Sequence, residues 1–149
     1  MAREAVEEKG GVNMELVADT NIVVAAILRP GMTRRLIFYP GFGLHSPKRV
    51  VSEIWAHHNE LVQKSQLSEK DYLDVVRIVL FNITLVPESN YHMFKEDAIA
   101  ISPDYDDWPF FAVALQRNCA IWSNEKRLKN QKKVKVYNTG ELFELLKQG

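Results

Sequence analysis

The chain has 149 residues, of which 46% are hydrophobic and 26% are charged. These are the proportions of a globular domain with a core, and they exclude disordered and collagen-like classes. Basic and acidic side chains both number 19, so the net charge predicts neither a nucleic-acid nor a membrane partner. The single cysteine, Cys119, excludes a disulfide within the chain. Without a long apolar stretch or a signal-peptide pattern, we expect a cytoplasmic protein.

Strand and helix patterns alternate along the body of the sequence. Residues 1–13 are poor in apolar side chains, which predicts a flexible leader before a single domain over 14–149. The expected strands are 15–19, 42–46, 82–86, 119–123 and 134–137. The expected helices are 21–28, 33–39, 47–64, 69–80, 90–99, 107–117 and 139–147. This order predicts an α/β three-layer sandwich, in which a mostly parallel five-stranded sheet has helices on both faces.

Acidic residues follow two of the expected strands. Asp19 ends the first strand, and Glu125 comes just after the strand at 119–123. Ligands of open α/β sheets bind outside the carboxyl ends of the strands, so we expect these two acids to meet in space. Two carboxylates ~5 Å apart repel by roughly 3 kcal/mol, and a divalent cation is the usual reason for such a cluster. The alternatives are that Asp19 only caps a helix and that Glu125 is an ordinary turn acid.

A third acid, Glu53, lies on the expected helix over 47–64. Ser46 is expected to cap this helix, and Pro47 suits its first position. At about 100° per residue, Glu53 falls roughly 60° outside one edge of the apolar stripe that contains Val50 and Ile54. Glu53 is therefore expected at the border between core and solvent, although an ordinary surface acid is the alternative.

The fourth acid, Asp107, is expected in the first turn of the helix over 107–117. It projects onto the apolar face of this helix, whereas Asp106 projects away from it and is expected to be solvated. The free N–H groups and the dipole of a helix start stabilise an acid there, which is also the simplest alternative to a functional role. Asp104 precedes the helix and is either its cap or a further metal ligand.

Four segments, in this order, resemble those of the PIN domain, the nuclease fold of VapC-type toxins and RNA-processing factors. The resemblance runs from about Glu15 to Leu146. The segments are Asp19-Thr20-Asn21, Ser46-Pro47 through Glu53-Ile54, Asp104 through Leu115, and Ile121 through Leu128. One departure occurs at Glu125, where the family usually has Asp and the longer side chain changes the reach of the carboxylate.

The resemblance implies an acidic pocket that binds Mg²⁺ or Mn²⁺ and cleaves RNA by metal-activated water. The implied catalytic and metal-binding acids are Asp19, Glu53, Asp107 and Glu125. Carboxylate ligands suit these hard cations better than Zn²⁺. The implied supporting polar groups are Thr20, Asn21 and Ser123.

Basic residues near the acids are candidates for RNA binding. Residues 126–135 contain six basic side chains, which can neutralise phosphates. The candidates are Lys126, Arg127, Arg34 and Arg35, and for each of them an ordinary solvated surface position is the alternative.

The leading hypothesis is a metal-dependent ribonuclease that acts as the toxin of a toxin–antitoxin pair. Its expected partners are RNA, an antitoxin protein and further copies of the chain in a homodimer or higher homo-oligomer. The second hypothesis is a non-catalytic PIN-like module that binds RNA or protein. A phosphoacceptor receiver domain is a third hypothesis, but none of the expected strands ends in the lysine that it needs.

Overall fold

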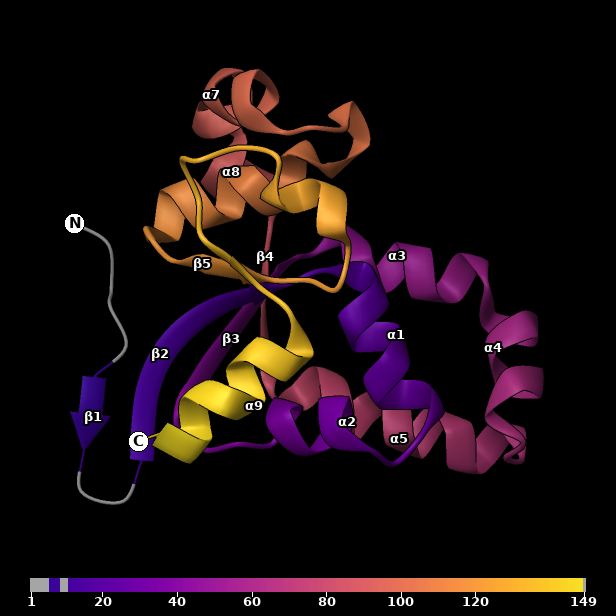
Figure 1. Cartoon of the computed structure of the whole chain (residues 1–149). Helices are drawn as coiled ribbons and strands as arrows, with labels where there is room; N and C mark the ends of the chain where they lie inside the picture. Colours follow the sequence, from indigo (N-terminus) through magenta and orange to yellow (C-terminus); the bar gives the residue numbers. More distant parts are fainter. Residues whose placement is uncertain (1–5, 9–10, 149) are drawn as a thin grey trace.

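The structure, a computed structural model, describes residues 6–8 and 11–148 (Figure 1). The strands are β1 (Val6–Glu8), β2 (Gly11–Ala18), β3 (Phe42–Pro47), β4 (Ile83–Val86), β5 (Ala120–Trp122) and β6 (Val136–Tyr137). The α-helices are α1 (Thr20–Leu28), α2 (Met32–Ile37), α3 (Arg49–Ala56), α4 (His58–Ser65), α5 (Glu69–Phe81), α6 (Glu88–Tyr91), α7 (Lys95–Ile101), α8 (Trp108–Arg117) and α9 (Thr139–Gln148). The 3₁₀ helices are η1 (His92–Phe94), η2 (Tyr105–Asp107) and η3 (Lys126–Lys129).

The central sheet has β2 in its middle. Its order is β4-β3-β2-β5-β6, and each neighbouring pair in this order is parallel. The chain adds β3 and β4 on one side of β2 and then crosses to add β5 and β6 on the other side. The carboxyl ends of β2 and β5 therefore form the switch point at which open α/β sheets bind ligands.

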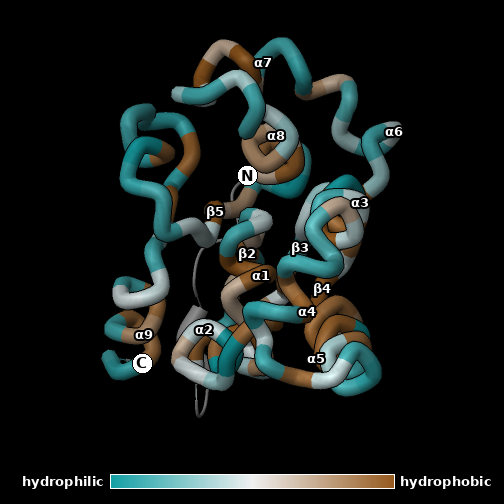
Figure 2. The backbone as a smooth tube through the Cα atoms, turned by 90° about the vertical axis from the view of Figure 1, so that its right-hand side faces the viewer, coloured by the Kyte–Doolittle hydropathy of each residue, from teal (hydrophilic) through white to brown (hydrophobic). Residues whose placement is uncertain are grey.

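Helices cover both faces of this sheet, because the side chains of β2 alternate between two hydrophobic clusters. Leu16 and Ala18 pack in one cluster with side chains of α1, α2, α3, α4, α5 and α9. Val17 packs in the other cluster with side chains of α6, α7 and α8. Figure 2 shows β5 and β4 as hydrophobic segments inside the molecule. The predicted three-layer α/β fold with a five-stranded parallel sheet is confirmed.

The N-terminal part of the described chain adds one antiparallel strand. β1 pairs with the start of β2, from Val6 opposite Asn13 to Glu8 opposite Gly11. The first parallel strand thus starts earlier than the predicted residue 15. The flexible leader predicted for 1–13 falls partly on residues 1–5 and 9–10, which lie outside the described residues, and it stays a prediction.

The single helix predicted over 47–64 is wrong. The structure has two helices, α3 and α4, which meet at His57 with φ −109° and ψ 21°. Pro47 ends β3 opposite Val86, and the hydroxyl of the buried Ser46 donates to the carbonyl of Ala18 at 2.7 Å. Ser46 therefore joins the ends of β3 and β2, and it is not the cap of a helix.

Other predicted boundaries differ in smaller ways. The helix predicted over 90–99 is divided into α6, η1 and α7. The helix predicted from Asp107 starts at Trp108, and Asp107 ends η2. Within the described residues, no helix has the length and apolar character that crossing a membrane requires.

Replacing Ser46 tests the link between β3 and β2. Ser46→Ala removes a buried donor, so the free energy of unfolding is expected to fall by about 1–2 kcal/mol. Ser52→Ala is the matched control, because its exposed hydroxyl donates only to the Arg49 carbonyl of its own helix, and a change within about 0.5 kcal/mol is expected. Urea unfolding measures both variants. Equal effects would contradict a structural role for the Ser46 hydroxyl.

Candidate active site

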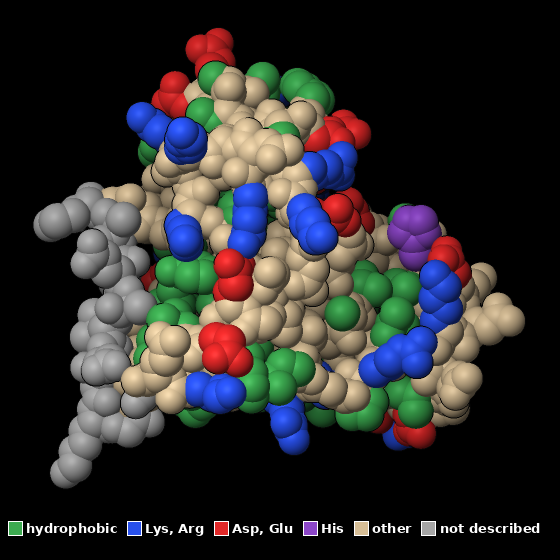
Figure 3. All heavy atoms as spheres, viewed as in Figure 1, with side chains coloured by type: hydrophobic (Ala, Val, Ile, Leu, Met, Phe, Trp, Pro, Cys, Tyr) green, Lys and Arg blue, Asp and Glu red, His purple; other side chains and the backbone are tan. Residues whose placement is uncertain are grey.

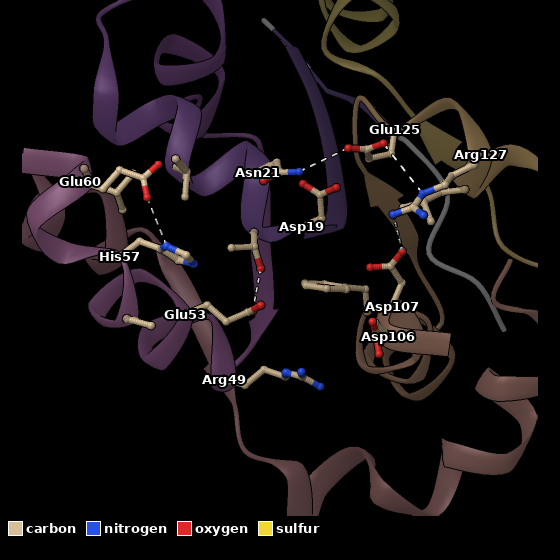
Figure 4. A pocket seen from close by; sticks show the side chains of 16 residues that line it. Asp19, Asn21, Arg49, Glu53, His57, Glu60, Asp106, Asp107, Glu125 and Arg127 are labelled. Atoms are coloured by element: carbon tan, nitrogen blue, oxygen red, sulfur yellow. Dashed lines mark hydrogen bonds and ion pairs between the residues drawn. The ribbon is translucent and has the colours of Figure 1, made fainter. Parts of the chain in front are cut away.

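A cleft of about 700 Å³ opens at the carboxyl edge of the sheet. Figure 4 shows the start of α1 at its centre, α3 on one side, and α8 and η3 on the other. The acids that line it are Asp19, Glu53, Glu60, Asp106, Asp107 and Glu125. The four acids singled out in the sequence therefore share one hollow, although they come from four separate parts of the chain.

Asp19 is the most buried of these acids, with 6% of its surface exposed. One carboxylate oxygen accepts a hydrogen bond from the backbone N–H of Ile22 at 2.9 Å, so Asp19 caps α1. The other oxygen accepts from the hydroxyl of Ser123. Burial raises the pKa of Asp19 to about 6 against the lowering effect of these hydrogen bonds, and the charges of Asp107 and Glu125 raise it further.

Glu53 reaches the cleft from α3 and is held by the helix opposite. Its Oε1 accepts a hydrogen bond from the hydroxyl of Thr20 at 2.9 Å. Because Thr20 is the first residue of α1, this bond fixes the Glu53 carboxylate next to the helix that Asp19 caps. Glu53 is half-buried, at the edge of the core.

Arg127 forms ion pairs with acids on the other side of the cleft. Its guanidinium lies 2.6 Å from Asp104, 3.6 Å from Asp107 and 3.9 Å from Glu125. Asp104 also caps η2 through the N–H of Asp106, so it faces Arg127 and is not among the residues that line the cleft. Burial raises the pKa of Asp107, whereas Arg127 lowers it and the neighbouring acids raise it. Arg127 is thus the counter-ion of these acids.

The loop after β5 carries Ser123 and Glu125 to the site. The backbone N–H of Glu125 donates to the Ser123 hydroxyl oxygen at 3.0 Å, and the side chain of Asn21 lies 3.4 Å from Glu125 Oε1. Ser123 therefore links Asp19 to Glu125. The predicted supporting residues Thr20, Asn21 and Ser123 each contact at least one of the four acids.

The C-terminal helix α9 supports the same loop. The indole N–H of the fully buried Trp122 donates to the hydroxyl of Thr139 at 3.0 Å. The side-chain oxygen of Asn124 accepts from the backbone N–H of Thr139 at 2.9 Å. Both residues flank Ser123, so the start of α9 fixes the backbone that presents Ser123 and Glu125.

Arg49 also lines the cleft, although it was not among the residues predicted from the sequence. Figure 4 shows it reaching into the opening below Glu53, toward Asp106, and no interaction joins it to the other residues drawn. His57 and Glu60 also line the cleft and lie 3.5 Å apart. The signal for Arg49 is its spacing, because it precedes Glu53 by four residues and therefore shares its helix face.

The other basic candidates lie outside the cleft. Arg34 donates to the carbonyls of Ala26 and Ile27 at 2.7 and 3.0 Å, so it caps the far end of α1. Arg35 is exposed on the same helix, α2. The nine residues of α1 separate these arginines from Asp19 by roughly 13 Å. Lys126 is exposed beside Glu125 and is not a lining residue.

The cleft has the donor chemistry of a site for a hard cation. Among residues 6–8 and 11–148, no three His, Cys, Asp or Glu side chains already lie close enough to hold a metal ion together. Its acids nevertheless offer carboxylate oxygens, which Mg²⁺ and Mn²⁺ prefer. The pKa values of Asp19 and Asp107 are raised because these carboxylates are buried and lie near other acids. A bound cation would offset the free-energy cost of holding their negative charges there.

Comparison with known proteins gives the family. A family model described as PIN domain matches residues 17–141. The fold is similar to a chain in the crystal structure of VapBC2 from Rickettsia felis bound to a DNA fragment from their promoter, with a TM-score of 0.62 and 14% identity. The match covers 84% of this chain and 98% of that one. No curated protein gives a significant match. The chain belongs to the PIN domain family.

The pKa of Asp19 predicts a pH-dependent effect of Asp19→Asn. Asp19 titrates near 3.8 when unfolded and near 6 when folded, so the folded state binds more protons between these values. Its contribution to the free energy of unfolding therefore falls as the pH rises through this window. Without metal, the stability of Asp19→Asn relative to wild type is expected to rise by about 2–3 kcal/mol between about pH 4 and pH 8.

Denaturant unfolding in EDTA at several pH values measures this difference. Asp97→Asn, at an exposed position on α7, is the matched control for the change of residue type. A difference between Asp19→Asn and wild type that does not change with pH would show that Asp19 titrates alike in both states.

Proposed function

We propose that the chain is a metal-dependent ribonuclease that hydrolyses phosphodiester bonds of RNA. The observation that carries this proposal is the shared cleft, into which Asp19, Glu53, Asp107 and Glu125 come from four separate parts of the chain. Family membership supports it, because PIN domains are generally nucleases. The particular metal, the RNA substrate and the roles of the residues are our proposal.

In this proposal the four acids hold Mg²⁺ or Mn²⁺. Such an ion, when bound, lowers the pKa of water and neutralises charge on the phosphate. Ser123 keeps Asp19 and Glu125 in place, and Thr20 does the same for Glu53. Asn21 positions Glu125, which is one carbon longer than the usual Asp of the family and so needs a partner that directs it.

Basic side chains beside the cleft would hold the RNA backbone. Figure 3 shows Lys and Arg side chains across the middle of one face, over the segment that follows β5. The side chain of Gln131 orders this segment with four hydrogen bonds to backbone groups, two of them at 2.9 Å to the N–H groups of Lys133 and Val134. An ordered lysine-rich loop next to an acidic cleft suits a phosphate backbone. Lys126, Arg127 and Arg35 remain candidates for the same role, and Arg34 would contribute charge only.

The biological setting we propose is that of a cytoplasmic toxin neutralised by an antitoxin protein. The fold similarity to a chain of the VapBC2 toxin–antitoxin complex supports this setting. Self-association into a homodimer or a higher homo-oligomer belongs to the same proposal. Ile78 and Phe81 of α5, which are 56% and 91% exposed, are the apolar side chains that would support it.

The second candidate function is a non-catalytic PIN-like module that binds RNA or protein. The position of Arg127 favours it, because the positive charge of this side chain already lies within 4 Å of Asp104, Asp107 and Glu125 and offsets part of their negative charge. This module would bind RNA without cleaving it, and divalent ions would not raise its melting temperature.

RNA cleavage tests the leading function. Single-stranded RNA is expected to be degraded with Mn²⁺ or Mg²⁺ but not with EDTA, and Asp19→Asn is expected to lower the rate at least ~100-fold because it removes a central ligand. Asp97→Asn is the control and keeps the wild-type rate. Gel analysis of end-labelled RNA measures the products. If Asp19→Asn cuts as fast as wild type, the cleavage arises elsewhere.

Replacing Arg127 tests the competition between this side chain and a cation. Arg127→Ala removes the positive charge near Asp107 and Glu125, so Mn²⁺ is expected to raise the melting temperature at roughly tenfold lower concentrations than in wild type. Lys129→Ala is the control, because Lys129 pairs with Glu141 and not with the cleft acids. An unchanged Mn²⁺ midpoint would contradict the competition.

A further inference from the structure

A second hollow of about 600 Å³ lies beside the acidic cleft, between α3 and α6. Figure 2 shows these two helices next to each other. We call this hollow the Trp55 groove, and its lining residues are Lys48, Arg49, Val51, Ser52, Trp55, Pro87, Glu88 and Tyr91. Its surface is mainly apolar, with two basic side chains at the start of α3.

α3 separates the groove from the acidic cleft. At about 100° per residue, its residues fall on three faces roughly 120° apart. Val50 and Ile54 face the core, Arg49 and Glu53 face the cleft, and Ser52 with Trp55 faces the groove. Arg49 stands at the helix start and lines both hollows. A helix with its side chains is about 10 Å wide, so one short oligonucleotide can reach from the cleft to the groove.

Trp55 is held in place although 55% of its surface is exposed. Its ring stacks on that of His58, with the ring centres 5.0 Å apart and an angle of 24° between the planes. His58 is itself fixed by Glu69, whose carboxylate lies 2.7 Å from the imidazole, and by the ring of Tyr72. A ligand that stacks on Trp55 therefore meets a ring with little rotamer freedom left to lose.

The charges at the groove suit a nucleic acid. Arg49 lines both the groove and the cleft, and its neighbour Lys48 lines the groove, so a phosphate backbone that passes between the two hollows would meet positive charge. The acid in the lining, Glu88, has a partner in His92 at 3.3 Å. Basic side chains next to an ordered, exposed aromatic ring form the combination that binds single-stranded nucleic acid through phosphates and base stacking.

We propose that the Trp55 groove is a base-stacking subsite for single-stranded RNA. A base stacks on Trp55, and Arg49 with Lys48 holds the backbone between this base and the phosphate in the cleft. The subsite rests on the proposed ribonuclease function and adds to it that the substrate is unpaired, because a base can reach Trp55 only outside a duplex.

Tryptophan fluorescence tests the subsite directly. Trp108 and Trp122 are 6% and 0% exposed, so Trp55 is the accessible tryptophan of the chain. Titration with a short single-stranded oligoribonucleotide in EDTA is expected to quench its emission without cleavage. Trp55→Ala is expected to weaken binding about 5- to 100-fold, whereas Trp55→Phe keeps a ring and most of the affinity.

Two further variants complete the experiment. Lys48→Gln is expected to weaken binding and to reduce its salt dependence, because it removes one phosphate contact. Met93→Ala is the control, because this exposed apolar residue lies on η1, outside both hollows. Circular dichroism and a melting curve confirm that each variant is folded. Equal affinity of wild type, Trp55→Ala and Lys48→Gln overturns the subsite.

Cleavage assays separate this inference from the proposed function. If wild type cleaves RNA and Trp55→Ala does so with an unchanged KM on long and short substrates, the result supports the ribonuclease function and contradicts the subsite. If wild type does not cleave RNA but binds it in a Trp55-dependent way, the result contradicts the proposed hydrolysis and supports the subsite. If Trp55→Ala lowers the mass of an oligomer and leaves RNA affinity unchanged, the groove belongs to a second copy, which also overturns the subsite.

Discussion

A buried carboxylate at the carboxyl ends of β2 and β5 determines how the rest of the cleft is built. Both oxygens of Asp19 accept hydrogen bonds, one from the first turn of α1 and one from Ser123 after β5. The same side chain therefore starts a helix and joins two strands that are far apart in sequence. Its burial also makes its negative charge costly, which its raised pKa reflects. A cation bound near Asp19 would lower the desolvation cost of this buried carboxylate, and a site of this kind therefore favours a bound cation.

Arg127 shows how the chain balances the other acids of the cleft. Its guanidinium is shared among Asp104, Asp107 and Glu125, so like charges are kept close without an external partner. An arginine beside a partly buried acid counteracts the rise in pKa that desolvation causes. The positively charged segment after β5 is consequently divided between two roles. Its first turn neutralises the protein's own acids, and its later lysines remain on the surface, where Gln131 orders the backbone.

The sequence predicted the sheet and the meeting of Asp19 with Glu125 because both follow from one rule about parallel strands, whereas the resemblance to PIN domains added Glu53 and Asp107. Each apolar run ends at the same edge, so the residues after the runs come together. The break at His57 was not predictable in this way, because the apolar stripe continues across it to Leu61. The contacts of Ser46 and Arg34 were also not predicted, because each side chain donates to a backbone carbonyl of another element. Ser46 donates to the carbonyl of Ala18, and Arg34 donates to that of Ala26. Such long-range pairs leave no periodic signal in sequence.

The contacts of Thr139 have a consequence for the order in which the cleft is completed during translation. The backbone that presents Ser123 and Glu125 is fixed by Trp122 and Asn124, and both bond to the start of α9. A nascent polypeptide that has not yet emerged beyond this helix lacks these supports. Ser123 and Glu125 would then take their places in the cleft only after α9 has emerged, and a chain truncated before α9 would lack both of these hydrogen bonds.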